Sequence, residues 1–320
     1  METHFDSVLF VAFGGPTPGC CRRVEPCPGS EAVCFIRSIV GDNPVVQGRI
    51  AEVATHYQQL GGYSPFNALA RRQASGVAAR LKTQGLLLPI YVGMRHWTPF
   101  VQDVLQEMAR HGLQRILAVI LAPHQCFASW EWYQQTVTQG LAALGERCPQ
   151  VTYLEPWYTH AGYITAIADS LRQAYQQLGK ERAQRAALIY TAHSIPAAMA
   201  AAAPYAQQFD ATAAAATQLV GHQSYHLAYQ SQAAGTPRPW LGPDINIALQ
   251  QVRDEGYREV IISPIGFLCD HVEVLYDLDI AAQETATACG LTYVRAPTVG
   301  DHPAFLSMLS DLIAARVMAA

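Results

Sequence analysis

The sequence predicts an α/β protein of two similar halves, each a parallel sheet with helices on both faces. First, short apolar runs rich in β-branched residues alternate with helical stretches along the 320 residues, which is typical of parallel sheets. Second, the chain echoes itself, because Val8–Pro16 resembles Ala187–Pro196 and Gly112–Leu121 resembles Gly256–Ile265. The length suits two Rossmann-like domains of ordinary size.

The first half is expected to span residues 1–158. Its first strand, Val8–Phe13, is an apolar run that ends at Gly14 and Gly15, where backbone can approach a ligand closely. The other elements are apolar runs or periodic stretches bounded by Gly and Pro signals. The expected strands are 88–93, 115–121 and 151–154, and the expected helices are 45–59, 64–83, 101–110 and one that fades near residue 145.

The second half is expected to span residues 159–302, with the helix from 303 to 320 packing back on the first half. Its first strand, Ala186–Thr191, leads into the exit loop Ala192–Pro196. If strands and helices alternate here too, the strand ends and polar loops of both halves surround one inter-domain cleft. The remaining expected strands are 224–229, 260–265 and 291–294, and the expected helices are 163–178, 211–221 and 245–255.

Composition excludes several classes of protein. Half of the residues are hydrophobic and 14% are charged, which indicates a globular chain. The net charge of −4, with no run of Lys or Arg, excludes a nucleic-acid partner. With no signal-like N-terminus and no apolar run long enough for a bilayer, we expect a soluble, cytoplasmic monomer.

Four of the eight cysteines lie in one turn-rich loop among Pro and Gly residues. Thiolates gathered in such a loop can hold zinc or a [2Fe–2S] cluster, although the spacing matches no common pattern for either. Free thiols are the competing interpretation. The four residues are Cys20, Cys21, Cys27 and Cys34.

An acidic stretch follows the apolar strand 260–265. If the stretch is one α-helix, four of its carboxylates fall within about 60° of one another. No Lys or Arg occurs between Arg258 and Arg295 to neutralise them, so the stripe predicts a path or site for a divalent cation rather than a solvated face. The four are Asp270, Glu273, Asp277 and Glu284.

His193 lies in a loop directly after a strand, and Pro196 follows it. An imidazole held there beside a carboxylate can act as a base or a metal ligand near neutral pH. A hydrogen-bonded loop residue is the competing interpretation. His96 has a similar position, but its neighbours Trp97 and Pro99 also suit a packed loop.

Several motifs in this order resemble the ferrochelatase family over nearly the whole chain. The strongest are Thr191–Pro196, Trp240–Asp244 and Gly266–Asp277. The compact length, the Gly-Met-Arg-His loop and Tyr133 make the chain most similar to the soluble coproporphyrin III ferrochelatases. Supporting stretches are Gly61–Pro65, Gly93–Phe100 and Leu121–His124.

The resemblance implies insertion of Fe²⁺ into a porphyrin during heme biosynthesis, with coproporphyrin III preferred and no resident cofactor required. It implies that His193 binds iron and takes pyrrole protons, that Glu273 faces it across the ring, and that Asp277 and Glu284 deliver the metal. The implied substrate-binding residues are Phe13, Arg37, Arg49, Ser64, Arg95, His96, Tyr133 and Trp240.

Two positions depart from the family pattern. Phe13 stands where soluble members often carry a Tyr that reaches the metal, and Ala281 stands where another carboxylate is common. The alternatives are a protoporphyrin IX ferrochelatase, a cobalt or nickel tetrapyrrole chelatase, and a metal- or solute-binding protein of the same architecture.

Overall fold

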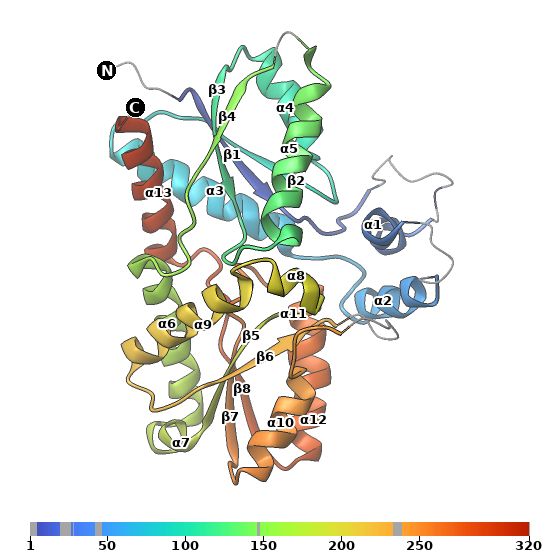
Figure 1. Cartoon of the computed structure of the whole chain (residues 1–320), viewed down its shortest axis with the longest axis vertical. Helices are drawn as coiled ribbons and strands as arrows, with labels where there is room; N and C mark the ends of the chain where they lie inside the picture. The colour runs from blue at the N-terminus through green and yellow to red at the C-terminus, as the bar shows by residue number, and fades with distance from the viewer. Residues whose placement is uncertain are drawn as a thin grey trace. The chain divides into compact units, whose positions relative to one another are not determined.

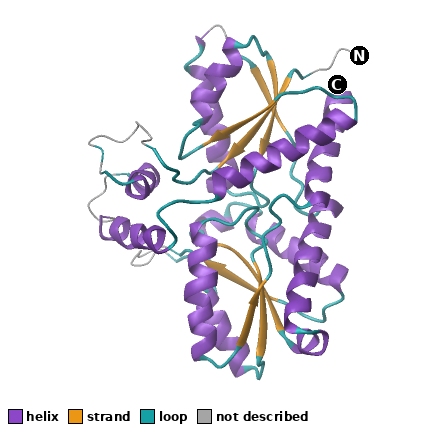
Figure 2. Cartoon of the chain, turned by 180° about the vertical axis from the view of Figure 1, so that it is seen from behind, coloured by secondary structure: helices purple, strands orange, loops and turns teal. Residues whose placement is uncertain are grey.

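The computed structural model describes residues 5–19, 27, 29–41, 47–145, 148–232 and 239–319. Within them, two four-stranded sheets have the orders β2-β1-β3-β4 and β6-β5-β7-β8, and every pairing is parallel. Figure 1 labels the elements, and Figure 2 shows helices beside each sheet. The predicted fold of two Rossmann-like parallel sheets flanked by helices is therefore confirmed.

The first sheet is built around β1 (Ser7–Ala12), whose six residues are all buried. A strand covered on both faces needs an unbroken apolar run, which is why the pattern here is continuous rather than alternating. Its partners are β2 (Ile90–Met94), β3 (Arg115–Ile120) and β4 (Gln150–Tyr153). The helices are α1 (Glu31–Val40), α2 (Gln47–Gln59), α3 (Phe66–Thr83), α4 (Val101–Arg110) and α5 (Trp132–Ala142).

Helix α1 corrects the expectation of a cysteine loop that extends to Cys34. The Ser30 hydroxyl caps the helix by accepting a hydrogen bond from the Val33 amide at 3.5 Å. Cys34 lies on the buried face of α1 with Phe35 and Ile36. The prediction that Cys34 lies in the loop is therefore wrong, because Cys34 is a buried residue of a helix. This position does not test whether Cys34 binds a metal.

The second sheet is built around β5 (Ala187–His193). Its core is formed mainly by aliphatic side chains from the sheet, α10 and the acidic segment. The other strands are β6 (His226–Gln230), β7 (Glu259–Ser263) and β8 (Thr292–Arg295). The helices are α6 (Ala161–Leu178), α7 (Lys180–Arg185), α8 (Ala197–Ala201), α9 (Tyr205–Val220), α10 (Ile245–Asp254), α11 (Val272–Tyr276) and α12 (Gln283–Ala288). The last helix of the chain is α13 (Pro303–Met318).

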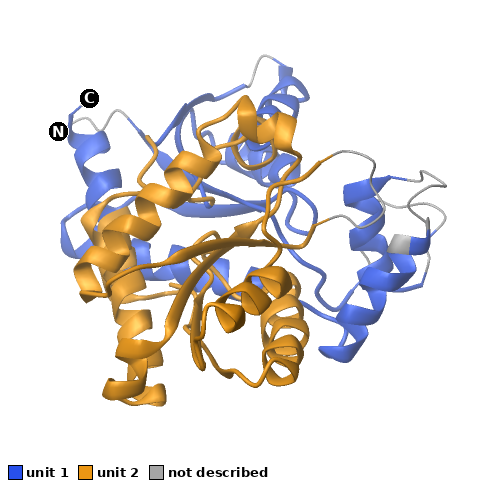
Figure 3. Cartoon of the chain, turned by 60° about the horizontal axis from the view of Figure 1, so that its bottom comes forward, with its two compact units in different colours: residues 1–121, 132–154, 310–320 blue, residues 122–131, 155–309 orange. Residues whose placement is uncertain are grey.

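The chain divides into two compact units, coloured in Figure 3. Unit 1 comprises residues 1–121, 132–154 and 310–320, and unit 2 comprises 122–131 and 155–309. Helix α13 therefore belongs to unit 1 from residue 310 on. The segment 122–131 belongs to unit 2 because it is bound to α9, through His124 Nε2 to Thr212 Oγ1 at 3.0 Å and Gln125 N to Gln208 Oε1 at 2.8 Å. The expected boundary at residue 158 and the expected inter-domain site stay predictions. Over the described ranges, no helix is both long and apolar enough to cross a membrane.

Gly266 allows the chain to turn tightly after β7 against the end of β5. Its amide donates to the Thr191 carbonyl at 3.0 Å. A Cβ atom at this position would lie 2.6 Å from both Cα and Cβ of Ala192, which is closer than carbon atoms pack. The absence of a side chain at Gly266 therefore brings the segment after β7 next to the residues that lead into His193.

We predict that Gly266→Ala destabilises the protein by about 1–3 kcal/mol, because the added methyl group must push β5 and the following loop apart. Urea denaturation followed by circular dichroism measures this change. Gly48→Ala in α2 is the matched control, since a Cβ there meets nothing within 4 Å. Equal unfolding free energies for Gly266→Ala and wild type would show that the close approach is not a constraint.

Candidate active site

His193 ends β5, and its hydrogen bonds define which ring nitrogen is free. Nδ1 lies 2.5 Å from the Ser194 carbonyl oxygen, which can only accept, so Nδ1 carries the hydrogen. In the neutral ring, Nε2 then holds the lone pair. Nε2 lies 3.7 Å from Oε2 of Glu273, and the two side chains are 37% and 38% exposed. Two accessible bases therefore face each other across a gap that suits a proton or a cation.

Glu273 lies in the first turn of α11, where its negative charge is favourable. His271 caps this helix, because its Nδ1 accepts a hydrogen bond from the Glu273 amide at 3.1 Å. Burial lowers the pKa of His271, which keeps the ring neutral and able to accept. The motif Asp-His-Val-Glu thus includes the residue that caps helix α11. This cap fixes where the helix begins and so where Glu273 lies.

Asp277 is the second carboxylate that the structure brings toward His193 and Glu273. It opens a π-helix, η4 (Asp277–Ala282), and accepts a hydrogen bond from Ser231 Oγ at 2.5 Å. Ser231 adopts a φ of 60°, a backbone conformation that is uncommon for residues other than Gly. Burial raises the pKa of Asp277 to about 6, partly offset by the Ser231 hydrogen bond. Asp277 can therefore hold or release a proton near physiological pH.

Gln230 is a site residue that the sequence interpretation missed. It ends β6, is fully buried, and accepts from Thr191 Oγ1 at 3.0 Å. Its amide nitrogen donates to the Glu273 carbonyl at 3.1 Å and lies 3.5 Å from Asp277 Oδ2. Gln230 thereby fastens the acidic segment to β5. The polar pair Gln230–Ser231 directly after an apolar strand was the available signal.

The acidic stripe differs from the expectation in two respects. The segment is not one α-helix, because α11, η4 and α12 follow one another and Asp270 precedes the cap. The 3.6-residue spacing therefore does not relate Glu284, in α12, to Glu273. The stripe is also neutralised in part, since Arg295 lies 3.2 Å from Asp270. This contact corrects the expectation that no cation serves these carboxylates.

In unit 1, aromatic rings surround the predicted substrate residues Phe13 and His96. The two rings lie 4.7 Å apart, and Phe35 lies 6.0 Å from Phe13. Burial, with Arg95 as a second cause, lowers the pKa of His96 to about 3. His96 is therefore neutral at physiological pH.

Arg95 lies beside aromatic rings of α5. Its guanidinium carbon is 4.3 Å from the centre of the Trp132 ring and 5.8 Å from that of Tyr133, which is the geometry of a cation–π contact. Burial lowers the pKa of Arg95, with an opposing contribution from Tyr133. The structure thus brings Arg95 and Tyr133 together.

The other predicted residues are more scattered. Ser64 is buried and bonds the Pro16 carbonyl through its amide at 2.9 Å. Arg37 lies half-buried on α1, and Trp240 lies half-buried in a bridge with Pro196. The side chain of Arg49 is outside the described residues.

The predicted cysteine metal site is not tested by the structure. Cys20 and Cys21 lie outside the described residues, Cys27 is exposed and Cys34 is buried. Where side chains are described, no group of three His, Cys, Asp or Glu residues could hold a metal ion. Both the zinc or [2Fe–2S] interpretation and the free-thiol interpretation therefore stay open.

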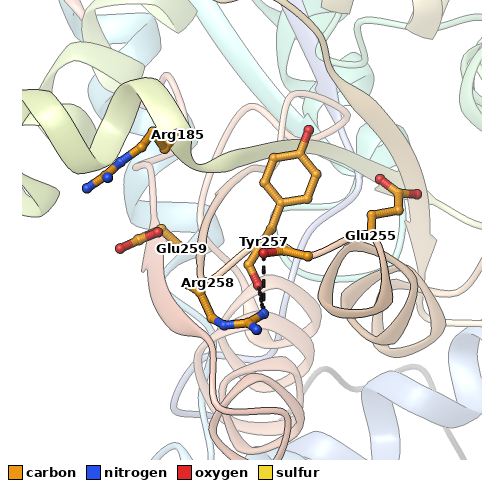
Figure 4. A pocket seen from close by; sticks show the side chains of 6 residues that line it. Arg185, Glu255, Tyr257, Arg258 and Glu259 are labelled. Carbon is orange, nitrogen blue, oxygen red and sulfur yellow. Dashed lines mark hydrogen bonds between the residues drawn. The ribbon is translucent and has the colours of Figure 1, made fainter.

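A pocket of about 530 Å³ lies elsewhere in unit 2. Figure 4 shows the Arg258 guanidinium turned back to hydrogen-bond main-chain oxygens beside it. The pocket lies at the start of β7, whereas His193 ends β5, so the two are at opposite edges of one parallel sheet. Its lining residues are Arg185, Glu255, Gly256, Tyr257, Arg258 and Glu259.

The fold defines a class of protein built from two parallel α/β units, and in this chain a histidine and a glutamate face each other where strands of one sheet end. A solved structure of SirB from Bacillus subtilis with Fe³⁺ has a similar fold, with a TM-score of 0.59. The alignment covers 97% of this chain and 95% of that one at 11% sequence identity. This likeness shows the fold alone.

Sequence comparison shows the family. The family model for ferrochelatase matches residues 6–317. The coproporphyrin III ferrochelatase of Nocardia farcinica is 34% identical over 316 residues, covering 96% of this chain and 87% of that protein. The ferrochelatase of Rhodopirellula baltica is 34% identical over 315 residues, covering 98% and 86%. The chain belongs to the ferrochelatase family. The prediction of an enzyme that inserts iron into a porphyrin is therefore confirmed, and the alternative of a metal- or solute-binding protein is not supported.

We predict that Asp277 makes the protein less stable as the pH rises from about 4 to about 7. An unfolded aspartate titrates near pH 4, whereas burial raises the pKa of Asp277 to about 6. The folded state therefore binds this proton more tightly, and the resulting stability is fully present below about pH 4 and is lost through about pH 6.

Asp277→Asn removes the titration but leaves an oxygen that accepts from Ser231. Relative to wild type, the melting temperature of this variant should rise progressively between about pH 4 and pH 7. Differential scanning fluorimetry at several pH values measures the difference. Asp311→Asn, at an exposed carboxylate on α13, is the control. A constant difference across this range would contradict the proposed cause.

Proposed function

We propose that this protein inserts Fe²⁺ into coproporphyrin III, with His193 and Glu273 acting together on the ring centre. The observation that carries the proposal is the 3.7 Å separation between His193 Nε2 and Glu273 Oε2. The Ser194 carbonyl holds the Nδ1 hydrogen, so the basic nitrogen of the imidazole is the one that faces the carboxylate. Family membership supplies the reaction, and this geometry supplies the bases that it needs.

Metal insertion requires both proton acceptors and a route for the cation. A porphyrin gives up two N–H protons when its four nitrogens bind one Fe²⁺ ion, so the net reaction releases two protons. The neutral His193 ring takes one proton at Nε2, and the Glu273 carboxylate takes the other. A carboxylate beside the imidazole also stabilises the imidazolium that forms. The two side chains can thus bind the incoming iron before the ring nitrogens replace them as its ligands.

Asp277 and Glu284 are proposed to bring the metal to this pair. Asp277 is joined to Gln230 and Ser231, so its carboxylate is held in one orientation beside Glu273. Its pKa near 6 allows a proton to leave when a cation arrives, since a positive ion favours the ionised form. Glu284 lies beyond the π-helix and supplies a further carboxylate along the chain.

Coproporphyrin III is proposed as the substrate because its four propionates need more cations and hydroxyls than the two of protoporphyrin IX. Arg95, Ser64 and Tyr133 are the described candidates, with Arg37 on α1 and Arg49 on α2 as further ones. Trp240, Phe13 and His96 supply rings to contact the macrocycle. The phenyl ring of Phe13 cannot bind iron, so no axial ligand is assigned to that position.

Two further expectations remain proposals. Zinc or a [2Fe–2S] cluster at the cysteine loop is one of them, and elemental analysis with visible absorption of anaerobically purified protein decides between metal and free thiols. The other is a monomeric protein in the cytoplasm, for which sedimentation and fractionation are the direct measurements.

We predict that His193→Ala lowers the rate of iron insertion by about 10²–10⁴-fold, as expected for loss of a general base, while coproporphyrin still binds. Glu273→Gln should lose most activity as well, because an amide does not accept the proton. Anaerobic assays of turnover and fluorescence quenching by the porphyrin measure the two effects separately.

The chain offers a matched control for this experiment. His226 Nε2 and Glu255 Oε2 are also 3.7 Å apart, but this pair lies at the start of β6, at the opposite sheet edge. His226→Ala and Glu255→Gln should therefore retain wild-type turnover. Near-normal insertion by His193→Ala would remove this residue from the mechanism.

We predict that the enzyme uses coproporphyrin III with a higher kcat/KM than protoporphyrin IX, because additional propionates gain charge-assisted hydrogen bonds. Each such contact that is lost costs about 1.5–3 kcal/mol, so the preference should be at least about tenfold. Parallel assays with both porphyrins under identical iron and detergent conditions measure it. A preference for protoporphyrin IX would overturn the substrate assignment.

A further inference from the structure

Arg295 ends β8, and its guanidinium contacts carboxylates on both sides of α11. Toward Asp279 in the π-helix, Nε lies 2.5 Å from Oδ1 and Nη2 lies 2.9 Å from Oδ2. Toward Asp270, which precedes the helix cap, Nη1 and Nη2 lie 3.2 and 3.3 Å from the two oxygens. One side chain therefore holds both ends of the segment that carries Glu273 and Asp277.

The contacts of Arg295 are more shielded from water than the other arginine–carboxylate pairs described in unit 2. The Arg295 side chain is 14% exposed, whereas those of Arg172 and Arg182 are 48% and 46% exposed. Shielded charge pairs keep a defined geometry, while exposed pairs contribute little. A planar guanidinium can also donate to two carboxylates at once, which the single nitrogen of Lys does poorly.

The segment from Asp270 to Asp279, which Arg295 holds at both ends, needs tertiary contacts because it is short and irregular. Helix α11 has five residues and continues directly into a π-helix, and neither is stable without tertiary contacts. Tyr293, also from β8, donates to the Leu278 carbonyl at 2.8 Å. On the other side of the segment, Gln230 donates to the Glu273 carbonyl. The segment is thus fastened to β6 and β8.

We infer that Arg295 is a positioning residue for metal insertion, because it binds Asp270 and Asp279 to β8 and thereby holds Glu273 opposite His193. The inference rests on the proposed function, since it matters only if Glu273 acts on the ring centre. Arg295 itself contacts neither of the two bases in the described contacts. A displacement of Glu273 by about 1 Å is enough to lower a rate on the order of 10²-fold.

The test compares Arg295→Lys with Arg182→Lys, its matched control. Arg182 binds Glu259 at 3.1 Å and Thr292, the first residue of β8, at 2.7 Å, so it supports the opposite edge of the same sheet. Both variants keep the positive charge. Turnover is measured below the melting transition of every variant, together with the porphyrin dissociation constant and the KM for iron.

For Arg295→Lys we expect kcat to fall at least about tenfold, with the porphyrin dissociation constant within about twofold of wild type. Arg182→Lys should lose thermal stability at most and keep kcat. If Arg295 only stabilised the fold, both variants would have lower melting temperatures. The kcat of Arg295→Lys would then not fall while its porphyrin dissociation constant stayed the same. If Arg295→Lys does not fold, Asp270→Ala, which frees only the beginning of the segment, should show the same loss of kcat.

Two results overturn the inference in distinguishable ways. In the first result, Arg295→Lys and Asp270→Ala both have wild-type kcat while Glu273→Gln is inactive. This would refute the positioning role of Arg295 and leave the proposed function unchanged. Wild-type kcat for Glu273→Gln would refute the proposed function, and the positioning role would fall with it.

Discussion

Parallel strands in one sheet all end at the same edge, and the candidate site depends on this constraint. His193 ends β5, Gln230 ends β6 and Arg295 ends β8, so three residues far apart in sequence lie along the same end of one sheet without a dedicated loop. The chain leaving β7 passes Gly266 and turns into the acidic segment at the same edge. The sheet therefore places a base, its facing carboxylate and the side chains that hold them in one region.

The separation of a histidine from a glutamate does not by itself make a site. His193 with Glu273 and His226 with Glu255 share a distance of 3.7 Å. Only the first pair lies at the carboxyl edge, beside a half-buried aspartate whose pKa is raised to about 6 by burial. The distance therefore supports a function only together with the surroundings of the pair, which are a defined His193 tautomer, a helix start at Glu273 and a second carboxylate at Asp277.

The sequence predicted the strands well, because continuous apolar runs are local signals, and the structure brings the predicted His193 and Glu273 within 3.7 Å of each other. The sequence interpretation missed the contacts of Arg295, since nothing local shows that the end of β8 reaches Asp270 and Asp279. The spacing of the acidic residues indicated one α-helix, because nothing in the local sequence signals a π-helix. The helix after the cysteine loop was missed as well, although Ser30 followed by Glu31 is a helix-start signal.

The π-helix also limits how the length of this chain can vary. Residues Asp277–Ala282 form a wide turn, and α12 beyond it packs Ala286 into the core of unit 2. Because a π-helical turn already takes more residues than an α-helical turn, inserting a further residue would rotate the part before it by about 100° relative to the part after it. Either Glu273 would leave His193 or Ala286 would leave the core. A further insertion is therefore unfavourable here, even where many substitutions would preserve the fold.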